Sequence, residues 1–472
     1  MYKLVEIKAS EKRKFDELCA SVMEKNQAAG IAAAFFDKDG NIIYENFYGY
    51  RDAEKKLPID ENTIFGLASI TKSFVTLCIL KLAYEGKISL DDPVSKYFPD
   101  FTGKNMKGIL RLKHLLSHAG GFYPLRRTCV YDVAEKLGLN EEKDGDFATN
   151  LRLIEEGAKI VASQMDNITE HIGLPGEKMS YCNDGFGLLS DVVRMAGGEK
   201  TYSDYVRKNI LEPLYMERTM CDFIKPALDE NSSMLYKVEK GKRVCHHDYH
   251  DFSFVLNGAG VMKSTIENMI KYVRMYLNDG VSAEGRRIIP ARCLEEMEKP
   301  RQVMNPDLYY CWGITVKRIE GLNMFGHSGG LPGVSSYFAF MPEAGIGGVV
   351  LCNTEGCASP SICEAGMRMA LGKETKLTRY DYPEIKWDED FVKDVCGKYI
   401  SDETADSAGY EIVSEDGKLL MKAGDNLTEL KPFSSHYALA RKMFSDAFFK
   451  PLVNDEGRVY AARYGSTVFK KA

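Results

Sequence analysis

Two residues that could do chemistry together stand three positions apart in Ser69-Ile70-Thr71-Lys72. They open an apolar run that predicts a helix over residues 70–86, and residues i and i+3 lie on one face of a helix. Free N–H groups and the dipole at a helix start favour negative charge on the serine oxygen. A lysine on a buried face has a lowered pKa and can serve as a base. The motif alone is weak, because a capping serine beside a solvated lysine has the same sequence.

A serine–lysine site needs two further elements, a tyrosine close to a polar partner and an H-x-G strand opposite. Tyr-x-Asn occurs three times, and only the copy at residues 181–183 lies in a turn that leads into a helix. H-x-G also occurs three times, and only the copy at residues 327–329 lies in a strand-rich stretch. Chain order, spacing and element type therefore favour one set: Ser69 with Lys72, Tyr181 with Asn183, and His327 with Gly329.

The segment GHSGG at residues 326–330 also fits G-x-S-x-G, the turn that carries the nucleophile of α/β-hydrolases. That turn needs a helix after the serine, but alternating strand residues follow Ser328. It also needs a histidine downstream, and only His436 lies there, in the C-terminal region. Ser328 is therefore not the expected nucleophile. Gly329 and Gly330 are better interpreted as bare backbone against which a substrate can lie.

The elements around these residues follow from periodicity and turn signals. Helices are predicted over residues 10–29, 70–86 and 360–371, with a capped amphipathic helix within residues 258–278 and extra helices between Gly121 and Pro175. Strands are predicted as a hairpin within residues 31–50 and as a series over residues 308–353. We expect the early and late strands to pair in one antiparallel sheet flanked by helices, an α+β fold with an all-helical subdomain.

Three regions are expected along the chain. Residues 1–372 carry the chemistry, and residues 373–390 are polar, lack periodicity and predict a linker. Residues 391–472 contain short alternating strands separated by turns, which predicts a small all-β, barrel-like domain.

Five sequence blocks, in chain order, resemble the serine β-lactamase/D-alanyl-D-alanine-peptidase superfamily. The blocks are FGLASITKSFVTLCILKLAYEGKISLDDPVSKYFPDF, LRLKHLLSHAGGF, LPGEKMSYCNDGFGLL, GAGVMKSTIEN and GHSGGLPG. They are most similar to the branch of class C-like β-lactamases, esterases and D-amino-acid peptidases, over about residues 20–370. The resemblance implies a helical subdomain and an α/β subdomain with the site between them. The C-terminal domain is similar to the barrel-like appendage of some peptidases in this group.

The resemblance also implies catalytic roles. Ser69 would attack a carbonyl and form an acyl-enzyme. Lys72 and Tyr181 would share the role of general base, and Tyr181 would return the proton to the leaving group. The backbone N–H groups of Ser69 and Gly330 would form the oxyanion hole.

Substrate-binding roles are implied for residues around the nucleophile. Asn183 would hold the substrate amide and orient the lysine, and His327 would line the opposite wall. Many penicillin-binding enzymes have a lysine at this last position, so a fixed cation for a substrate carboxylate is missing or pH-dependent here. Tyr123 and His250 are candidate residues of the pocket rim.

Three functions remain open at this stage. The first is a serine hydrolase that cleaves an amide or ester bond of a peptide, a D-amino-acid peptide or a small ester. The second is an acyltransferase that uses the same acyl-enzyme. The third is a non-catalytic homologue that binds a peptide or ligand.

Composition limits partners and location. The net charge of −6 argues against nucleic acid or an anionic membrane as the main partner. No run of 18 apolar residues occurs, and the first residues show no signal peptide, so we expect a soluble cytoplasmic protein. The segment Cys245–His250 is expected to be a polar loop rather than a metal site. No cofactor is implied, the expected partner is a small molecule or peptide, and an oligomer cannot be deduced.

Overall fold

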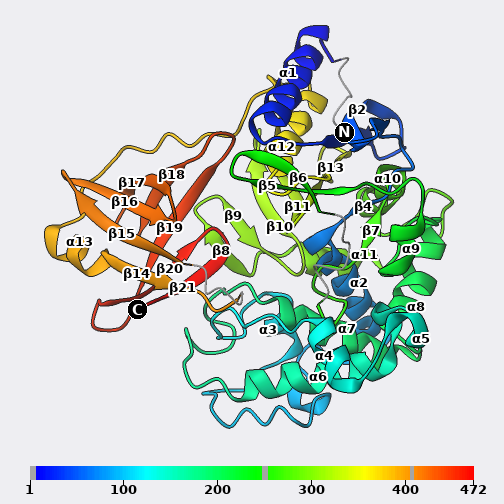
Figure 1. The fold of residues 1–472 in the computed structure, drawn as a ribbon, viewed down its shortest axis with the longest axis horizontal. Helices are drawn as coiled ribbons and strands as arrows, with labels where there is room; N and C mark the ends of the chain where they lie inside the picture. Colours follow the sequence, from blue (N-terminus) through cyan, green and yellow to red (C-terminus); the bar gives the residue numbers. More distant parts are fainter. Residues whose placement is uncertain (1–6, 247–253, 404–408) are drawn as a thin grey trace.

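One nine-stranded antiparallel sheet forms the centre of the α+β part of the chain (Figure 1). The structure is a computed structural model, and it describes residues 7–246, 254–403 and 409–472. The sheet order is β3-β2-β1-β13-β12-β11-β10-β9-β8, so the first and last strands of this part of the chain meet at its centre. The strands are β1 (Gly30–Asp37), β2 (Ile42–Asp52), β3 (Leu57–Pro58), β8 (Gln302–Asn305), β9 (Leu308–Tyr310), β10 (Thr315–Ile319), β11 (Leu322–Leu331), β12 (Val334–Met341) and β13 (Ile346–Cys352).

Helices cover both faces of the sheet because its central strands are apolar on both sides. In β1, Ala33 and Phe35 belong to the core under α1 (Ala9–Lys25) and α12 (Ser359–Ala370). Phe36 points the other way, into the larger core shared with α10 (Ile266–Leu277). The strand β1 is buried along its whole length, so its residues form a continuous apolar run rather than an alternating one.

The second part of the α+β region is helical and packs against one face of the sheet (Figure 1). At its centre is α2 (Thr71–Tyr84), which is buried nearly all round, as an apolar helix without a polar face must be. In the described ranges, no helix combines the length and apolar composition needed to cross a membrane. The remaining helices of this region are α3 (Leu112–Leu116), α4 (Val130–Leu137), α5 (Glu141–Asp144), α6 (Leu151–Asp166), α7 (Asn183–Gly197), α8 (Tyr202–Val206), α9 (Ile224–Leu228) and α11 (Ala291–Glu298).

Short strands outside the main sheet also occur between these helices. Two pairs form, β4 with β7 and β5 with β6. Their bounds are β4 (Phe65–Gly66), β5 (Leu235–Glu239), β6 (Lys242–His246) and β7 (Lys263–Ser264). The expected α+β class is confirmed, although the first helix ends at Lys25 rather than at residue 29. Gln27 has a φ of 52°, which stops the helix before β1 begins.

The C-terminal strands close into an eight-stranded antiparallel barrel, which confirms the predicted all-β, barrel-like fold. Closure comes from pairing of the first barrel strand with the last. Residues that alternate along the strands fill the interior, among them Tyr399, Ile412, Met421 and Phe449. The strands are β14 (Gly397–Ile400), β15 (Gly409–Glu415), β16 (Lys418–Ala423), β17 (Asn426–Ser434), β18 (Tyr437–Arg441), β19 (Asp446–Val453), β20 (Val459–Tyr464) and β21 (Thr467–Lys471).

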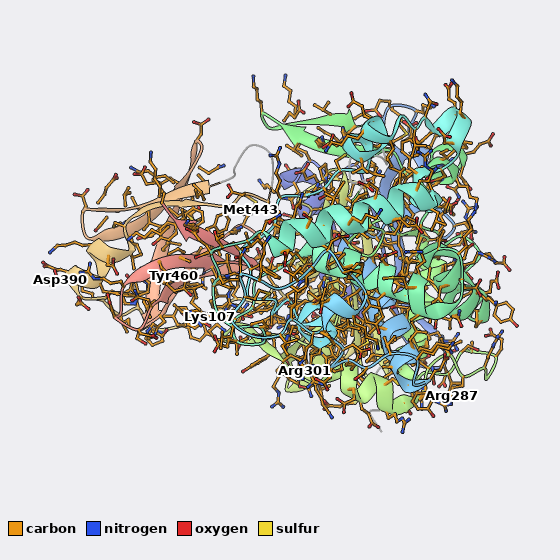
Figure 2. All side chains as sticks on the ribbon, turned by 90° about the horizontal axis from the view of Figure 1, so that it is seen from below. Lys107, Arg287, Arg301, Asp390, Met443 and Tyr460 are labelled. Atoms are coloured by element: carbon orange, nitrogen blue, oxygen red, sulfur yellow. The ribbon has the colours of Figure 1, made fainter. Side chains whose placement is uncertain are left out.

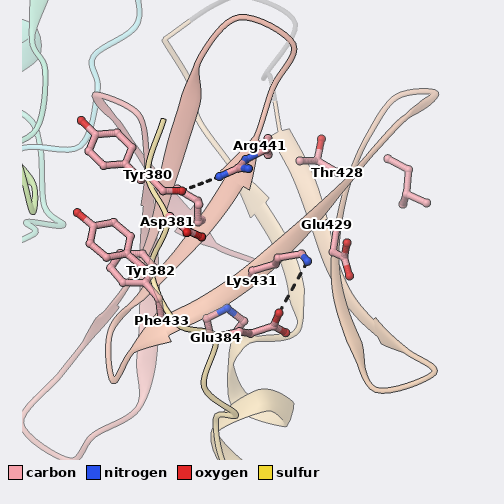
Figure 3. A pocket seen from close by; sticks show the side chains of 12 residues that line it. Tyr380, Asp381, Tyr382, Glu384, Thr428, Glu429, Lys431, Phe433 and Arg441 are labelled. Atoms are coloured by element: carbon pink, nitrogen blue, oxygen red, sulfur yellow. Dashed lines mark hydrogen bonds and ion pairs between the residues drawn. The ribbon is translucent and has the colours of Figure 1, made fainter. Parts of the chain in front are cut away.

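The segment between α12 and the short helix α13 (Glu389–Val395) has no helix or strand and lies along the outside of the barrel (Figure 3). Arg441 donates a hydrogen bond to the carbonyl oxygen of Tyr380 at 2.6 Å. Tyr382 stacks on Phe433 with ring centroids 4.3 Å apart. These contacts hold the segment against the barrel.

The barrel docks on the α+β region through its β20–β21 side. The Tyr460 hydroxyl, on the barrel side that faces the helices (Figure 2), donates to the carbonyl oxygen of Ile172 at 3.0 Å. It also accepts a hydrogen bond from Lys178 Nζ at 2.9 Å. Ile172, Ala461 and Val468 form a small apolar cluster at this contact. The barrel therefore has a defined position relative to the candidate site.

Candidate active site

Ser69 lies in a 3₁₀ turn, Ala68–Ile70, that leads directly into α2. Ala68 has a φ of 49°, a left-handed conformation that L-residues rarely adopt, so neighbouring groups must hold the turn in place. Leu67 provides two such anchors. Its N–H donates to the carbonyl oxygen of Met262 at 2.8 Å, and its own carbonyl oxygen accepts from the Ser336 hydroxyl at 2.7 Å. The nucleophile turn is thereby fixed to the sheet.

Lys72 lies one helical turn further along and is fully buried. Its Nζ is 3.1 Å from Ser69 Oγ, 2.8 Å from Asn183 Oδ1 and 2.5 Å from the carbonyl oxygen of Ala259. An ammonium would donate to all three oxygens. A neutral amine has two N–H groups for Asn183 and Ala259, and its lone pair is then directed at the Ser69 hydroxyl.

Burial lowers the pKa of Lys72 from 10.5 to about 7, with the charge of Arg127 acting in the same direction and that of Glu403 opposing it. The neutral, proton-accepting form is therefore well populated near pH 7. Burial raises the pKa of Tyr181, with the neighbouring Ser69 acting in the opposite direction. The two candidate bases thus differ in their resting protonation, since the lysine can accept a proton and the tyrosine keeps its own.

Tyr181 and Asn183 flank the start of α7, which brings both side chains to the nucleophile. The Lys72 amine lies 4.9 Å from the centroid of the Tyr181 ring. His118 packs against the other side of that tyrosine, with ring centroids 4.0 Å apart. The His118 Nδ1 atom accepts a hydrogen bond from the backbone N–H of Cys182 at 3.0 Å, which fixes the turn between the two functional residues.

A chain of hydrogen bonds continues from His118 across the pocket. Because its Nδ1 is an acceptor, a neutral His118 carries its proton on Nε2 and donates to the Tyr310 hydroxyl, 3.1 Å away. Tyr310 then donates to Nε2 of His327 at 3.2 Å. The Nδ1–H of His327 donates to the carbonyl oxygen of Ser328 at 2.6 Å. Every donor in this chain has an acceptor, so each ring is held in one tautomer and orientation.

Both histidines are neutral at physiological pH. Burial and the charge of Lys72 lower the pKa of His327 to about 3. Burial lowers the pKa of His118 well below its usual value of 6.5, with Lys72 again contributing. His327 therefore supplies no cation at the position where many penicillin-binding enzymes place a lysine.

The exposed edge of β11 lies beside the nucleophile turn. A two-residue turn joins β11 to β12 and pairs Leu331 with Val334. In such a hairpin the N–H of Leu331 points toward β12, and along β11 the N–H groups point alternately toward β12 and away from it. The N–H of Gly330 then faces the open edge, toward the pocket. A Cβ at Gly330 would meet no atom within 4 Å, whereas a Cβ at Gly329 would lie 2.1 Å from the Leu67 carbonyl oxygen. Gly329 thus permits close contact between β11 and the turn of Ser69.

The pocket over these residues has a volume of about 500 Å³. Ser69, Tyr181, Asn183, His327 and Gly330 line it together. Of the two residues expected at the rim, Tyr123 instead packs in the cluster between the helical region and the barrel. His250 lies outside the described residues, as does most of the segment Cys245–His250, so its place is undetermined by the structure.

Some pocket residues are not predicted by the sequence. Among them are Tyr310 and Glu403, and Glu403 enters from the C-terminal region. His118 is buried and hydrogen-bonds to Tyr310. The Asp446–Phe448 and Gly465–Thr467 segments of the barrel line the same cavity. His118 and Tyr310 lie in patterns that the sequence shows: His118 begins an H-x-G motif, and Tyr310 lies in an aromatic strand. For Glu403 no local signal exists, because its importance depends on how the barrel is docked.

Comparison of the sequence with known protein families shows which family the chain belongs to. The profile of the family described as Beta-lactamase matches residues 15–362. The chain belongs to the Beta-lactamase family. Among curated relatives, protein flp of Staphylococcus aureus strain N315 is 24% identical over 356 residues, which are 75% of this chain and 65% of flp. The human mitochondrial serine beta-lactamase-like protein LACTB is 27% identical over 303 residues, 54% of each chain. The chain thus spans about 65% of the length of flp.

Two solved structures of similar fold extend over the barrel as well. The octameric penicillin-binding protein homologue from Pyrococcus abyssi covers 97% of this chain with a TM-score of 0.64 at 24% identity. SurE covers 98% with a TM-score of 0.69 at 16% identity. At these identities the similarity establishes a shared fold of the Beta-lactamase-family domain with its C-terminal barrel. Family membership indicates a serine hydrolase-like protein.

Proposed function

We propose that the protein cleaves an amide or ester bond through an acyl-enzyme on Ser69, with a peptide, a D-amino-acid peptide or a small ester as substrate. The observation that carries the proposal is the contact of 3.1 Å between Ser69 Oγ and the buried amine of Lys72. A lysine with a pKa of about 7 in this position is suited to general-base catalysis near neutral pH.

The reaction follows from the positions of the side chains. Neutral Lys72 takes the hydroxyl proton of Ser69 as Oγ bonds to the carbonyl carbon. The oxyanion that forms accepts hydrogen bonds from the backbone N–H groups of Ser69 and Gly330. Tyr181 donates its phenolic proton to the leaving nitrogen or oxygen and regains a proton through Lys72. Water then attacks the acyl-enzyme by the same route in reverse, which releases the acid and restores the serine.

Covalent labelling with a serine-reactive phosphonate tests the nucleophile. Intact mass should show one phosphonyl group on the wild-type protein and none on Ser69→Ala. Ser328→Ala is the matched control, since this serine lines the same pocket and stands in the competing G-x-S-x-G motif. Labelling that persists in Ser69→Ala, or that disappears in Ser328→Ala alone, would contradict the assignment.

A panel of chromogenic esters, D- and L-aminoacyl anilides and a cephalosporin reporter then defines the reaction. Turnover of at least one compound that depends on Ser69 supports a hydrolase. D-leucine derivatives belong in the panel because a structure of SurE, which shares the fold, was determined with D-Leu. Binding without turnover of any ester or amide would support a non-catalytic homologue instead.

A further inference from the structure

The C-terminal barrel supplies a carboxylate to the candidate active site. After β14 the chain leaves the barrel and enters the pocket at Glu403, whose Oε1 accepts a hydrogen bond from Asn183 Nδ2 at 2.8 Å. The carbonyl oxygen of Glu403 accepts a second hydrogen bond, from the backbone N–H of Arg127 at 3.2 Å. The residue is therefore held by the helical region at both its side chain and its backbone.

The charge of Glu403 acts on nearby groups without a direct ion pair among the described residues: it raises the pKa of Lys72, and Arg127 lines the same pocket. The second carboxylate oxygen of Glu403 has no hydrogen-bond partner among the described residues, and no described lysine or arginine forms an ion pair with it. The other carboxylate on the pocket wall differs in this respect. Asp446 is paired with Arg379 at 2.8 Å and with Arg441 at 3.5 Å. Glu403 thus presents to the pocket a carboxylate oxygen that has no direct partner among the described residues.

The position of this charge relative to the nucleophile is set by Asn183. The amide oxygen of Asn183 accepts from Lys72, and its amide nitrogen donates to Glu403, with 2.8 Å at each end. Glu403 consequently lies one amide group beyond the base that contacts Ser69. A substrate group that reaches it must be attached close to the carbonyl under attack rather than at the end of a long side chain.

We propose that Glu403 binds a free α-ammonium group on the acyl part of the substrate, which makes the substrate an amide or ester of an unblocked amino acid. This inference rests on the proposed acyl-enzyme function. An ammonium has three donors and a positive charge, and it matches a partly buried carboxylate oxygen that lacks a partner. An N-acylated residue offers one neutral N–H and extra bulk at the same place. The protein would therefore act at the N-terminal residue, and the barrel would determine this specificity.

A pair of phosphonates tests the proposal without depending on a particular leaving group. Diphenyl (1-aminoethyl)phosphonate carries the amine, diphenyl ethylphosphonate lacks it, and both modify the serine by the same reaction. The readout is the second-order rate constant for labelling of Ser69, followed by intact mass. We expect the wild-type protein to prefer the amine-bearing compound by about 10- to 100-fold, as a charged hydrogen bond implies.

Glu403→Gln should reduce this preference at least several-fold while the ethylphosphonate still labels Ser69. The substitution also changes the field at Lys72, but this affects both compounds equally and cancels in the ratio. Asp402→Asn is the matched control, since it removes the adjacent exposed carboxylate and should leave the ratio unchanged. Labelling by ethylphosphonate in Glu403→Gln shows that the variant is folded and its nucleophile active.

Each alternative result has one meaning. Equal rates for the two compounds in the wild type, or a preference that survives in Glu403→Gln, would overturn the role of Glu403 and leave the acyl-enzyme function standing. A preference lost equally in Asp402→Asn would assign it to the general charge of the segment and also overturn the proposal. If neither compound labels Ser69, the proposed function fails and this inference fails with it.

Discussion

Replacement of Lys72 by methionine tests the central electrostatic feature of the site, a fully buried amine. Its pKa falls from 10.5 to about 7 because burial disfavours the ammonium. Each pKa unit corresponds to about 1.4 kcal/mol, so at pH 7 and below the buried lysine destabilises the folded state by roughly 5 kcal/mol relative to a solvated one. Methionine removes this cost, but it leaves the oxygens of Asn183 and Ala259 without their donor. Each unpaired buried oxygen should destabilise the folded state by about 1–3 kcal/mol.

The pH dependence separates these two effects. Between pH 7 and 10.5 the unfolded chain binds the lysine proton and the folded chain does not, so the stability of the wild type rises with pH. The lost hydrogen bonds in Lys72→Met do not titrate. At pH 7 the two proteins should differ by at most a few kcal/mol. With each further pH unit the wild type should gain about 1.4 kcal/mol over the variant.

Urea unfolding at pH 7, 8 and 9 measures this difference. Trp312 lies in the α+β region and Trp387 beside the barrel, so Trp387→Phe in both proteins leaves fluorescence that reports on the catalytic region. Phosphonate labelling of Ser69 should fall at least about 100-fold in Lys72→Met, because the base is lost. A stability difference between the two proteins that is independent of pH would refute the lowered pKa.

Three further outcomes are expected. The rate of Ser69 labelling in the wild type should rise with pH through a single step near 7, where Lys72 loses its proton, and a second step between pH 5 and 8 that disappears in His327→Asn would contradict the neutral state of His327. Tyr310→Phe removes the hydroxyl that joins His118 to His327 and leaves two buried ring nitrogens without this partner, so the melting temperature should fall and labelling should slow about 5- to 10-fold. An unchanged labelling rate would contradict a catalytic role for this hydrogen-bond chain. Gly329→Ala should abolish labelling because its Cβ would lie 2.1 Å from the Leu67 carbonyl oxygen, whereas Gly330→Ala points into open space and should fold normally by circular dichroism.

Most of the secondary structure could be predicted from the sequence because it depends on local patterns. The apolar run after Ser69 becomes α2, and the alternating segments after residue 390 become barrel strands. Helix ends depend on the conformation of single residues, since the stop after Lys25 follows from a positive φ at Gln27. The contact between Ser69 and Lys72 could also be predicted from the sequence, because a spacing of three residues places both on one helix face independently of the tertiary fold.

The sequence by itself therefore determined the family and predicted the candidate nucleophile and its base, all from short motifs in a fixed order. Only the tertiary structure decided what surrounds them. Glu403 meets Asn183 across 220 positions of sequence, and His118 meets Tyr310 across 192. Contacts of this range depend on how the barrel and the sheet dock on the helices, and docking is set by apolar surfaces such as the Ile172–Ala461–Val468 cluster. The lowered pKa of Lys72 has the same origin, because burial is a property of the packed chain and not of any motif.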